Sequence, residues 1–297
     1  MSFYKINPDN YENSEELLNF ADIIENLVKE NKTAKAIELL QSRLENGETF
    51  PIYYSLLAKI YEKMNLIHDA VETYQNGLQK HPGDSYLLIG LGFVYYTNKD
   101  YREAERTLTK AWVEDPVNVR LLTVLGNINK KKKKFKKASK YYKIANLLEP
   151  NNTFAIYGIA NCYRGMGHFA EELEFWLKFY EFEPNNKIAL TRIGDCYYKL
   201  KQMDQALIYY EKALDINYDF YALLGKARIY QEKDEYEKAL HIYEELSDSD
   251  KDNVRYFNEY IKFLLKFKKM DKARKIYNRA VKLFPGNNYI TSLKEHF

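Results

Sequence analysis

The stretch SYLLIGLGFVYYTNKDYREAERTLTKAWVEDPVN, residues 85–118, contains the pattern that decides the fold, and residues 119–152, VRLLTVLGNINKKKKKFKKASKYYKIANLLEPNN, repeat it. Each stretch holds leucines, small residues, aromatic residues and a late proline at matching positions. In the first these are Leu88, Leu91, Gly92, Tyr95, Ala104, Leu108, Ala111 and Pro116, and in the second Leu122, Leu125, Gly126, Asn129, Ala138, Tyr142, Ala145 and Pro150. Similarity at a fixed period of this length indicates a repeat architecture.

Each repeat contains two amphipathic helical patterns separated by a short polar turn. Small residues such as Gly92 and Ala104 let the two helices approach closely, and Pro116 cannot continue a helix, so it marks the break before the next repeat. One helical pair cannot bury its own apolar faces, and neighbouring pairs therefore stack. The sequence predicts an all-α solenoid.

The pattern resembles the tetratricopeptide repeat (TPR) family over nearly the whole chain. Eight units fit, of which the first is the most degenerate and the sixth is one residue short: 17–50, 51–84, 85–118, 119–152, 153–186, 187–219, 220–253 and 254–287. The resemblance implies a right-handed superhelix of helix-turn-helix repeats. We expect residues 1–16 to be flexible and residues 288–297 to form a short C-terminal capping helix.

The charge and the apolar runs of the sequence argue against several classes of function. A net charge of only +3 argues against a general polyanion binder. The N-terminus lacks the apolar region of a secretion signal, and the longest apolar run is much shorter than the ~20 residues that span a bilayer. We therefore expect a cytoplasmic protein without membrane contact.

No catalytic constellation stands out. The five histidines lack metal-ligand spacing, and the glycine pairs lack the third glycine of a nucleotide loop. Cys162 and Cys196 occupy the same position in adjacent repeats, which predicts buried, inert thiols. The prediction is a protein without enzymatic activity, cofactor or metal.

One stretch offers an alternative. Asp248, Asp250, Asp252 and Glu259 have the ligand spacing of an EF-hand calcium loop, although Asn253 replaces the glycine of its sharp turn. The repeat register instead interprets these residues as an inter-repeat turn with an aspartate capping the next helix.

The unit 153–186 departs from the pattern because Glu172 occupies the usual small-residue position. Large side chains crowd its second helix: Trp176, Phe179, Tyr180 and Phe182. This predicts either a locally repacked joint or an aromatic pocket for a partner.

The family resemblance implies that the first helices line a concave groove for peptides. Transferred by position, the groove residues are Tyr86, Phe93, Tyr96, Arg120, Asn127, Phe154, Tyr157, Asn161, Arg164, Arg192, Asp195, Tyr198, Tyr221 and Arg228. Asn127 and Asn161 share one position, and their amides can bond a peptide backbone as donor and acceptor. The predicted function is an interaction scaffold or adaptor that binds a partner protein or peptide.

A lysine-rich run adds a basic patch made of Lys130, Lys131, Lys132, Lys133, Lys134, Lys136 and Lys137. In the repeat register Lys130 and Lys131 end a helix, Lys132 to Lys134 form the turn, and Phe135 enters the next helix. The run is either a solvated turn or a patch that attracts an acidic partner. A nucleic-acid-binding solenoid is the alternative function.

Overall fold

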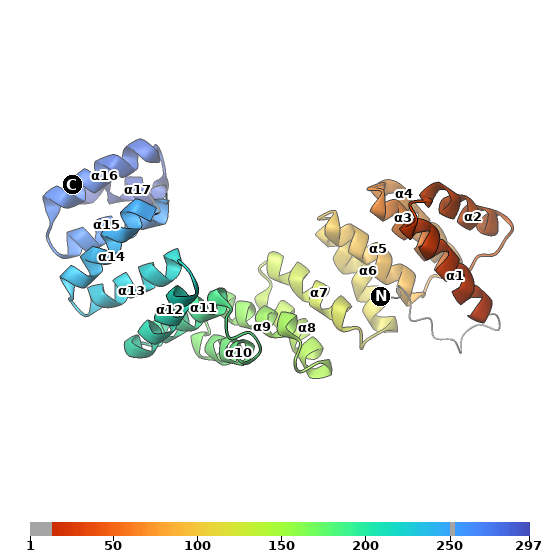
Figure 1. Ribbon diagram of the computed structural model, residues 1–297, viewed down its shortest axis with the longest axis horizontal. Helices are drawn as coiled ribbons and strands as arrows, with labels where there is room; N and C mark the ends of the chain where they lie inside the picture. The colour runs from red at the N-terminus through yellow and green to blue at the C-terminus, as the bar shows by residue number, and fades with distance from the viewer. Residues whose placement is uncertain (1–13, 250–252) are drawn as a thin grey trace. The chain divides into compact units, whose positions relative to one another are not determined.

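The computed structural model describes residues 14–249 and 253–297, and all regular structure in these two ranges is helical (Figure 1). The helices pair into hairpins, in which we call the first helix A and the second helix B. The hairpins are α1 (Ser14–Lys29) with α2 (Thr33–Glu45), α3 (Pro51–Lys63) with α4 (Ile67–Lys80), α5 (Ser85–Thr97) with α6 (Tyr101–Glu114), α7 (Val119–Lys131) with α8 (Phe135–Leu148), α9 (Thr153–Met166) with α10 (Phe169–Phe182), α11 (Lys187–Lys199) with α12 (Met203–Ile216), α13 (Phe220–Glu232) with α14 (Tyr236–Ser249) and α15 (Val254–Lys266) with α16 (Met270–Leu283). The predicted all-α solenoid of helical hairpins is confirmed.

Most A helices begin at an asparagine or aspartate cap. The side chains of Asp84, Asn118, Asn152 and Asn186 each accept a hydrogen bond from the backbone N–H three residues later. Such caps satisfy a backbone donor that the first helical turn leaves without a partner. Helix α3 starts differently, with Pro51 as its first residue. These local signals place the helix starts at a nearly constant interval of 34 residues.

The turn between A and B helices also recurs. One residue in each turn adopts a positive φ, which lets the A helix end in a left-handed cap. Glycine fills this position only once among the described turns, at Gly167, and the others use Asn31, Asn65, Lys99, Lys133, Lys201, Asp234 and Lys268. At Lys133 the N–H of the following residue, Lys134, bonds to the carbonyl of Asn129 at 2.9 Å. The lysine run thus contains one residue whose backbone conformation favours glycine.

The chain forms two compact units, residues 1–158 (unit 1) and 159–297 (unit 2), which we describe separately. In unit 1 the apolar faces of α1 to α3 form one core cluster, and those of α5 to α8 form another. In unit 2 the largest cluster joins α13 to α16 with the C-terminal elements.

The C-terminal elements close the last hairpin of unit 2. Helix α17 (Asn288–Thr291) continues into the 3-10 helix η2 (Ser292–His296), and Ile290 and Leu293 are buried in the core cluster. The Asn258 side chain in α15 donates a hydrogen bond to the Tyr289 carbonyl at 2.9 Å. The C-terminal segment therefore caps the hairpin as expected, with one turn of α-helix followed by 3-10 helix.

At the N-terminus, α1 already begins at Ser14, so the end of the 1–16 segment is helical, whereas residues 1–13 lie outside the described residues. None of the described helices is both long enough and apolar enough to cross a bilayer.

Candidate partner-binding surface

A buried tyrosine reaches from a B helix to the A-helix face in unit 1. The Tyr142 ring in α8 lies between Gly126 of α7 and Gly158 of α9, and a Cβ added at either glycine would come within 2.7 Å of the ring. The Tyr142 hydroxyl donates a hydrogen bond to Oδ1 of Asn127 at 2.8 Å. The predicted groove amide is thus held in one orientation, with its oxygen already engaged by the protein.

Unit 2 repeats this arrangement with different chemistry. The Tyr210 ring in α12 lies between Gly194 of α11 and Gly225 of α13, and its hydroxyl donates to Oδ1 of Asp195 at 3.0 Å. The other carboxylate oxygen of Asp195 accepts from Arg192 at 3.0 Å. Two predicted groove residues of unit 2 therefore bind each other.

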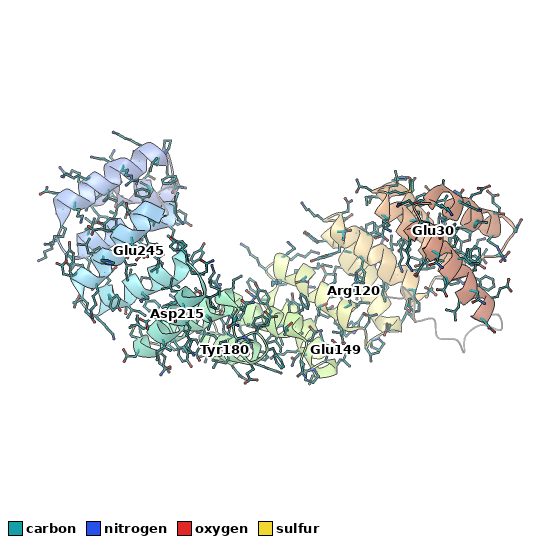
Figure 2. All side chains as sticks on the ribbon, viewed as in Figure 1. Glu30, Arg120, Glu149, Tyr180, Asp215 and Glu245 are labelled. Carbon is teal, nitrogen blue, oxygen red and sulfur yellow. The ribbon has the colours of Figure 1, made fainter. Side chains whose placement is uncertain are left out.

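The A-helix face of unit 1 combines aromatic rings with cations. The side chain of Arg120 in α7 is exposed, and its guanidinium lies 4.5 Å from the centre of the Phe93 ring in α5 (Figure 2). Arg120 forms no ion pair with the described residues. The Nζ atom of Lys130 lies 5.8 Å from the ring centres of Tyr142 and Tyr157. On this face of unit 1, therefore, cations lie over aromatic rings, whose quadrupole attracts them.

Aromatic groove residues extend along the same face of unit 1. Tyr86 is exposed at the start of α5, and Tyr96 packs against Tyr101 with ring centres 5.9 Å apart. Phe154, in the first turn of α9, has 81% of its surface exposed. These side chains provide apolar contact area that the described part of unit 1 does not bury.

On the corresponding face of unit 2, several predicted groove residues form ion pairs or hydrogen bonds with residues of the same unit. Arg228 in α13 donates two hydrogen bonds to the Glu259 carboxylate in α15, at 3.1 and 2.7 Å. Tyr198 donates to Glu232, and this bond joins α11 to α13. Since Arg192 and Asp195 also pair, three of the predicted groove residues of unit 2 are engaged in ion pairs with its own A helices.

The remaining predicted groove residues of unit 2 are more accessible. Tyr221 is exposed at the start of α13, with the Arg255 guanidinium 5.3 Å from its ring centre. Arg164 is exposed and Asn161 half-buried, both in α9. Asn127 and Asn161 fall in different units, so each belongs to the surface of its own unit.

Two lysines of the lysine-rich run form ion pairs with a neighbouring hairpin. Lys130 and Lys131 end α7, Lys132 to Lys134 form the turn, and α8 begins at Phe135. Lys132 and Lys137 both donate to the carboxylate of Glu105 in α6, at 2.8 and 2.6 Å. Burial alone would raise the pKa of Glu105, but these two lysines lower it from 4.5 to about 2. Two members of the predicted patch therefore hold adjacent hairpins together.

The atypical hairpin α9–α10 is packed around a buried acid. Glu172 is 2% exposed and accepts a hydrogen bond from Nε1 of Trp176 at 3.1 Å. Burial raises the pKa of Glu172, an effect that the Trp176 bond only partly opposes. Trp176 and Phe179 are also buried, whereas Tyr180 is half-buried and Phe182 is 41% exposed. Repacking around Glu172 therefore accounts for Trp176 and Phe179, and Tyr180 and Phe182 remain accessible.

The cysteines and the EF-hand-like residues named from the sequence do not form a reactive or metal-binding site among the described residues. Cys162 and Cys196 are buried, and burial raises the pKa of the Cys196 thiol well above its ordinary value. Of the EF-hand positions, the Asp248 side chain, Asp250 and Asp252 lie outside the described residues, while Glu259 binds Arg228. The cap of α15 is Asn253 rather than an aspartate.

Unit 1 has two further surface features. The side chains of His68, Asp69 and Glu72 on α4 come close enough together to ligate a metal, but His68 and Glu72 are exposed.

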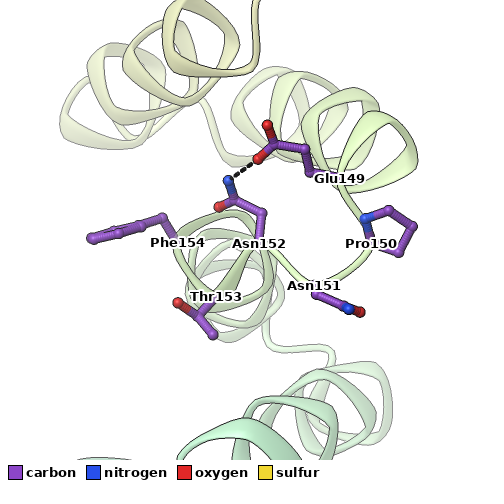
Figure 3. Close-up of a pocket in the computed structure, with 6 residues that line it drawn as sticks. All are labelled: Glu149, Pro150, Asn151, Asn152, Thr153 and Phe154. Atoms are coloured by element: carbon purple, nitrogen blue, oxygen red, sulfur yellow. Dashed lines mark hydrogen bonds between the residues drawn. The ribbon is translucent and has the colours of Figure 1, made fainter. Parts of the chain in front are cut away.

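An open hollow of about 780 Å³ lies at the turn between α8 and α9, lined by Glu149, Pro150, Asn151, Asn152, Thr153 and Phe154. In Figure 3 the Phe154 ring points away from Pro150 and Asn151, and Asn152 bonds to Glu149 at 2.7 Å. Neither feature carries catalytic geometry.

Comparison with known families agrees with the repeat geometry. Tetratricopeptide repeat models match residues 65–128, 119–152 and 188–217, and a model of YpiA-like C-terminal tetratricopeptide repeats matches residues 221–287. The chain is a tetratricopeptide repeat protein. No curated protein sequence matches this TPR protein.

Solved structures support the same assignment. The TPR protein YrrB, described as having an unusual peptide-binding site, is 26% identical with a TM-score of 0.59, and the match covers 64% of this chain and 98% of YrrB. MamA is 24% identical with a TM-score of 0.54, covering 57% of this chain and 92% of MamA. The structure of Naa15/Naa10 bound to HypK matches with 13% identity and a TM-score of 0.58, over 94% of this chain and 43% of the other. The last two show the fold alone.

Sequence reasoning missed two features of the TPR protein. The repeat pattern marked Tyr142 as a recurring position but did not reveal the hydrogen bond from its hydroxyl to Asn127. It also did not identify Glu105 as the acceptor for the lysines. A signal for the first was available, since Tyr74, Tyr142 and Tyr210 occupy equivalent positions and the Tyr74 hydroxyl likewise donates to Glu62, at 3.0 Å. No comparable pattern marks Glu105.

Proposed function

We propose that the protein is a non-enzymatic scaffold that binds an extended or helical segment of a partner protein along the A-helix face of unit 1. The TPR fold and its TPR neighbours support a protein–protein interaction scaffold, and TPR proteins generally lack enzymatic activity. The peptide class is further supported by the neighbour YrrB, which is described as having a peptide-binding site.

We choose the A-helix face of unit 1 because of one observation. The Tyr142 hydroxyl donates a hydrogen bond to the Asn127 oxygen, while the Asn127 amide nitrogen makes no hydrogen bond with the described residues. An amide fixed in this way offers a donor to a peptide carbonyl without first losing rotational freedom. Phe93 and Arg120 lie on the neighbouring A helices and supply apolar area and positive charge. We infer that the bound segment pairs a backbone carbonyl with Asn127 and an acidic side chain with Arg120.

The test begins with selection of binding peptides from a displayed random library, followed by titration of one selected peptide against purified variants. We expect Asn127→Ala and Arg120→Ala each to weaken binding about tenfold. Tyr142→Phe keeps the buried ring and removes only the hydroxyl, so a weakening of about threefold would identify the positioning effect on Asn127.

Tyr210→Phe is the matched control, because it makes the same change in unit 2. It should leave the affinity unchanged, and circular dichroism should show equal helix content in all variants. Equal affinity of the selected peptide for wild type, Asn127→Ala and Arg120→Ala would refute this assignment of the binding face.

A further inference from the structure

The outward faces of α6 and α8 carry the same pattern of charge followed by an apolar side chain. In α6, Arg102 and Arg106 lie one turn apart and Val113 follows two turns later; in α8, Lys136, Lys140 and Leu147 occupy the equivalent positions. Val113 and Leu147 are 73% and 78% exposed. The buried positions of both helices lie on the opposite side. We call these six residues the outer ridge.

The two halves of the outer ridge are neighbours within unit 1. Trp112 of α6 and Tyr141 of α8 are in edge contact with ring centres 5.4 Å apart, and Lys137 of α8 reaches Glu105 of α6. These two side-chain contacts place α6 and α8 next to each other on the B-helix side of unit 1. The outer ridge belongs to the B helices (Figure 1), whereas the proposed peptide face belongs to the A helices.

The outer ridge has an excess of positive charge. Helix α8 contains four lysines and no acidic residue. Helix α6 has three acidic residues: Glu103 pairs with Arg106, Glu105 is engaged by Lys132 and Lys137, and exposed Glu114 is the last residue of the helix, next to Val113. In the part of unit 1 that the structure describes, no ion pair is formed by Arg102, Lys133, Lys134, Lys136 or Lys140. Such a local excess in a nearly neutral chain attracts an anionic partner.

The chemistry of the outer ridge favours carboxylates over nucleic acid. The same lysine run already binds one carboxylate, that of Glu105, through two short ion pairs. No aromatic residue stands among the six ridge positions, so the ridge lacks the stacking surfaces on which single-stranded bases rest. Val113 and Leu147 also provide apolar contacts, which a phosphate backbone cannot use.

We propose that the outer ridge is a second binding surface of the protein, which docks an acidic amphipathic segment of a partner protein. The distance along α8 from Lys136 to Leu147 is about 16 Å, which a helix of about 11 residues spans. Glutamates one turn apart on that segment face the ridge cations, and an apolar residue two turns later contacts Leu147 or Val113. This surface is independent of the peptide face around Asn127.

The test uses a 16-residue peptide of four Glu-Glu-Leu-Glu repeats as the probe, titrated at several salt concentrations. The ridge variant Arg102→Gln/Arg106→Gln/Lys136→Gln/Lys140→Gln removes all four ridge cations and should bind it at least about tenfold more weakly. The charge-matched control Lys80→Gln/Lys262→Gln/Lys275→Gln/Lys282→Gln changes four exposed lysines elsewhere and should retain wild-type affinity. Equal weakening by both variants would show that only net charge matters and would overturn the proposal.

Two further arms test the apolar part of the ridge and its independence from the peptide face. Val113→Ser/Leu147→Ser should weaken binding of the Glu-Glu-Leu-Glu peptide about threefold and leave binding of a 16-residue polyglutamate unchanged. Asn127→Ala should leave both affinities unchanged, so failure of the ridge is distinguishable from failure of the proposed peptide face.

The last arm tests the chemical class of the ligand. A 16-nucleotide single-stranded RNA, or vesicles containing phosphatidylserine, that bound more tightly than the peptide and lost binding in the ridge variant would overturn the carboxylate assignment. Thermal unfolding of every variant checks that the fold is retained.

Discussion

Replacing Glu105 with glutamine tests whether the lysine run stabilises the fold. The substitution keeps the side-chain shape and removes the charge that both Lys132 and Lys137 contact. A pKa that falls from 4.5 to about 2 corresponds to about 3 kcal/mol. Lys137 is half exposed and solvent screens its interaction, so we expect a loss of about 1 to 1.5 kcal/mol at pH 7. For a cooperative unit of this size each kcal/mol lowers Tm by about 2–4 °C.

The stabilisation by the Glu105 ion pairs should decrease as the pH falls. The folded-state pKa of Glu105 lies below the unfolded-state value, so the stabilisation is present above about pH 4.5 and is lost as the pH falls toward 2. Thermal unfolding followed by circular dichroism from pH 7 to pH 3 should therefore show the difference between wild type and Glu105→Gln shrinking to less than half by pH 3.

Glu103→Gln is the matched control for this experiment. Glu103 lies on the same helix and pairs only with exposed Arg106, at 2.6 Å, so its replacement should cost less than about 0.5 kcal/mol. A Glu105→Gln variant as stable as Glu103→Gln at pH 7, or a deficit that persists undiminished at pH 3, would refute the ion-pair account.

Three further predictions concern stability, each measured by chemical or thermal unfolding. Lys133→Gly should stabilise the fold by about 0.5 to 1 kcal/mol because Lys133 has a φ of 57°, whereas Lys140→Gly, inside α8, should destabilise it by about 1 kcal/mol; a loss in both would contradict the turn assignment. Gly225→Ala should cost about 1–3 kcal/mol, since its Cβ would lie 2.3 Å from the Tyr210 ring; Gly83→Ala, with 4.0 Å of clearance, is the control and should shift stability by less than about 0.5 kcal/mol. Glu172→Gln should be more stable than wild type at pH 8 by roughly 1 to 3 kcal/mol, because burial raises the pKa of Glu172 and the fold favours its protonated form. This advantage should vanish near pH 4, and a constant advantage at all pH values would point to packing instead.

The repeat register predicted the hairpins because its signals are local. Asn118 and Asn186 stand immediately before A helices as caps, and the prolines and small residues recur at the same interval. The placement of Lys132 to Lys134 in a turn followed from the same register.

The candidate surface was less predictable because it depends on side chains that meet across helices. Position within the repeat predicted Asn127 and Arg228 as groove residues, but their contacts with Tyr142 and Glu259 depend on the residues that neighbouring elements supply at those points. Exposure also varies within one repeat position: Arg120 and Phe154 are exposed, whereas the equivalent Ile52 is buried. A family rule for the groove therefore identifies positions without giving their charge or accessibility.

The ion pairs between hairpins have a consequence for how the chain acquires its structure. Lys132 and Glu105 are 27 residues apart, and Arg228 and Glu259 are 31 apart, so each pair joins segments of adjacent hairpins that are synthesised in quick succession. Contacts of short sequence separation require little loop closure, which favours rapid folding. Hairpins stabilised mainly by their neighbours can also unfold in stages. We therefore expect amide hydrogen exchange to differ between hairpins instead of reporting one global opening.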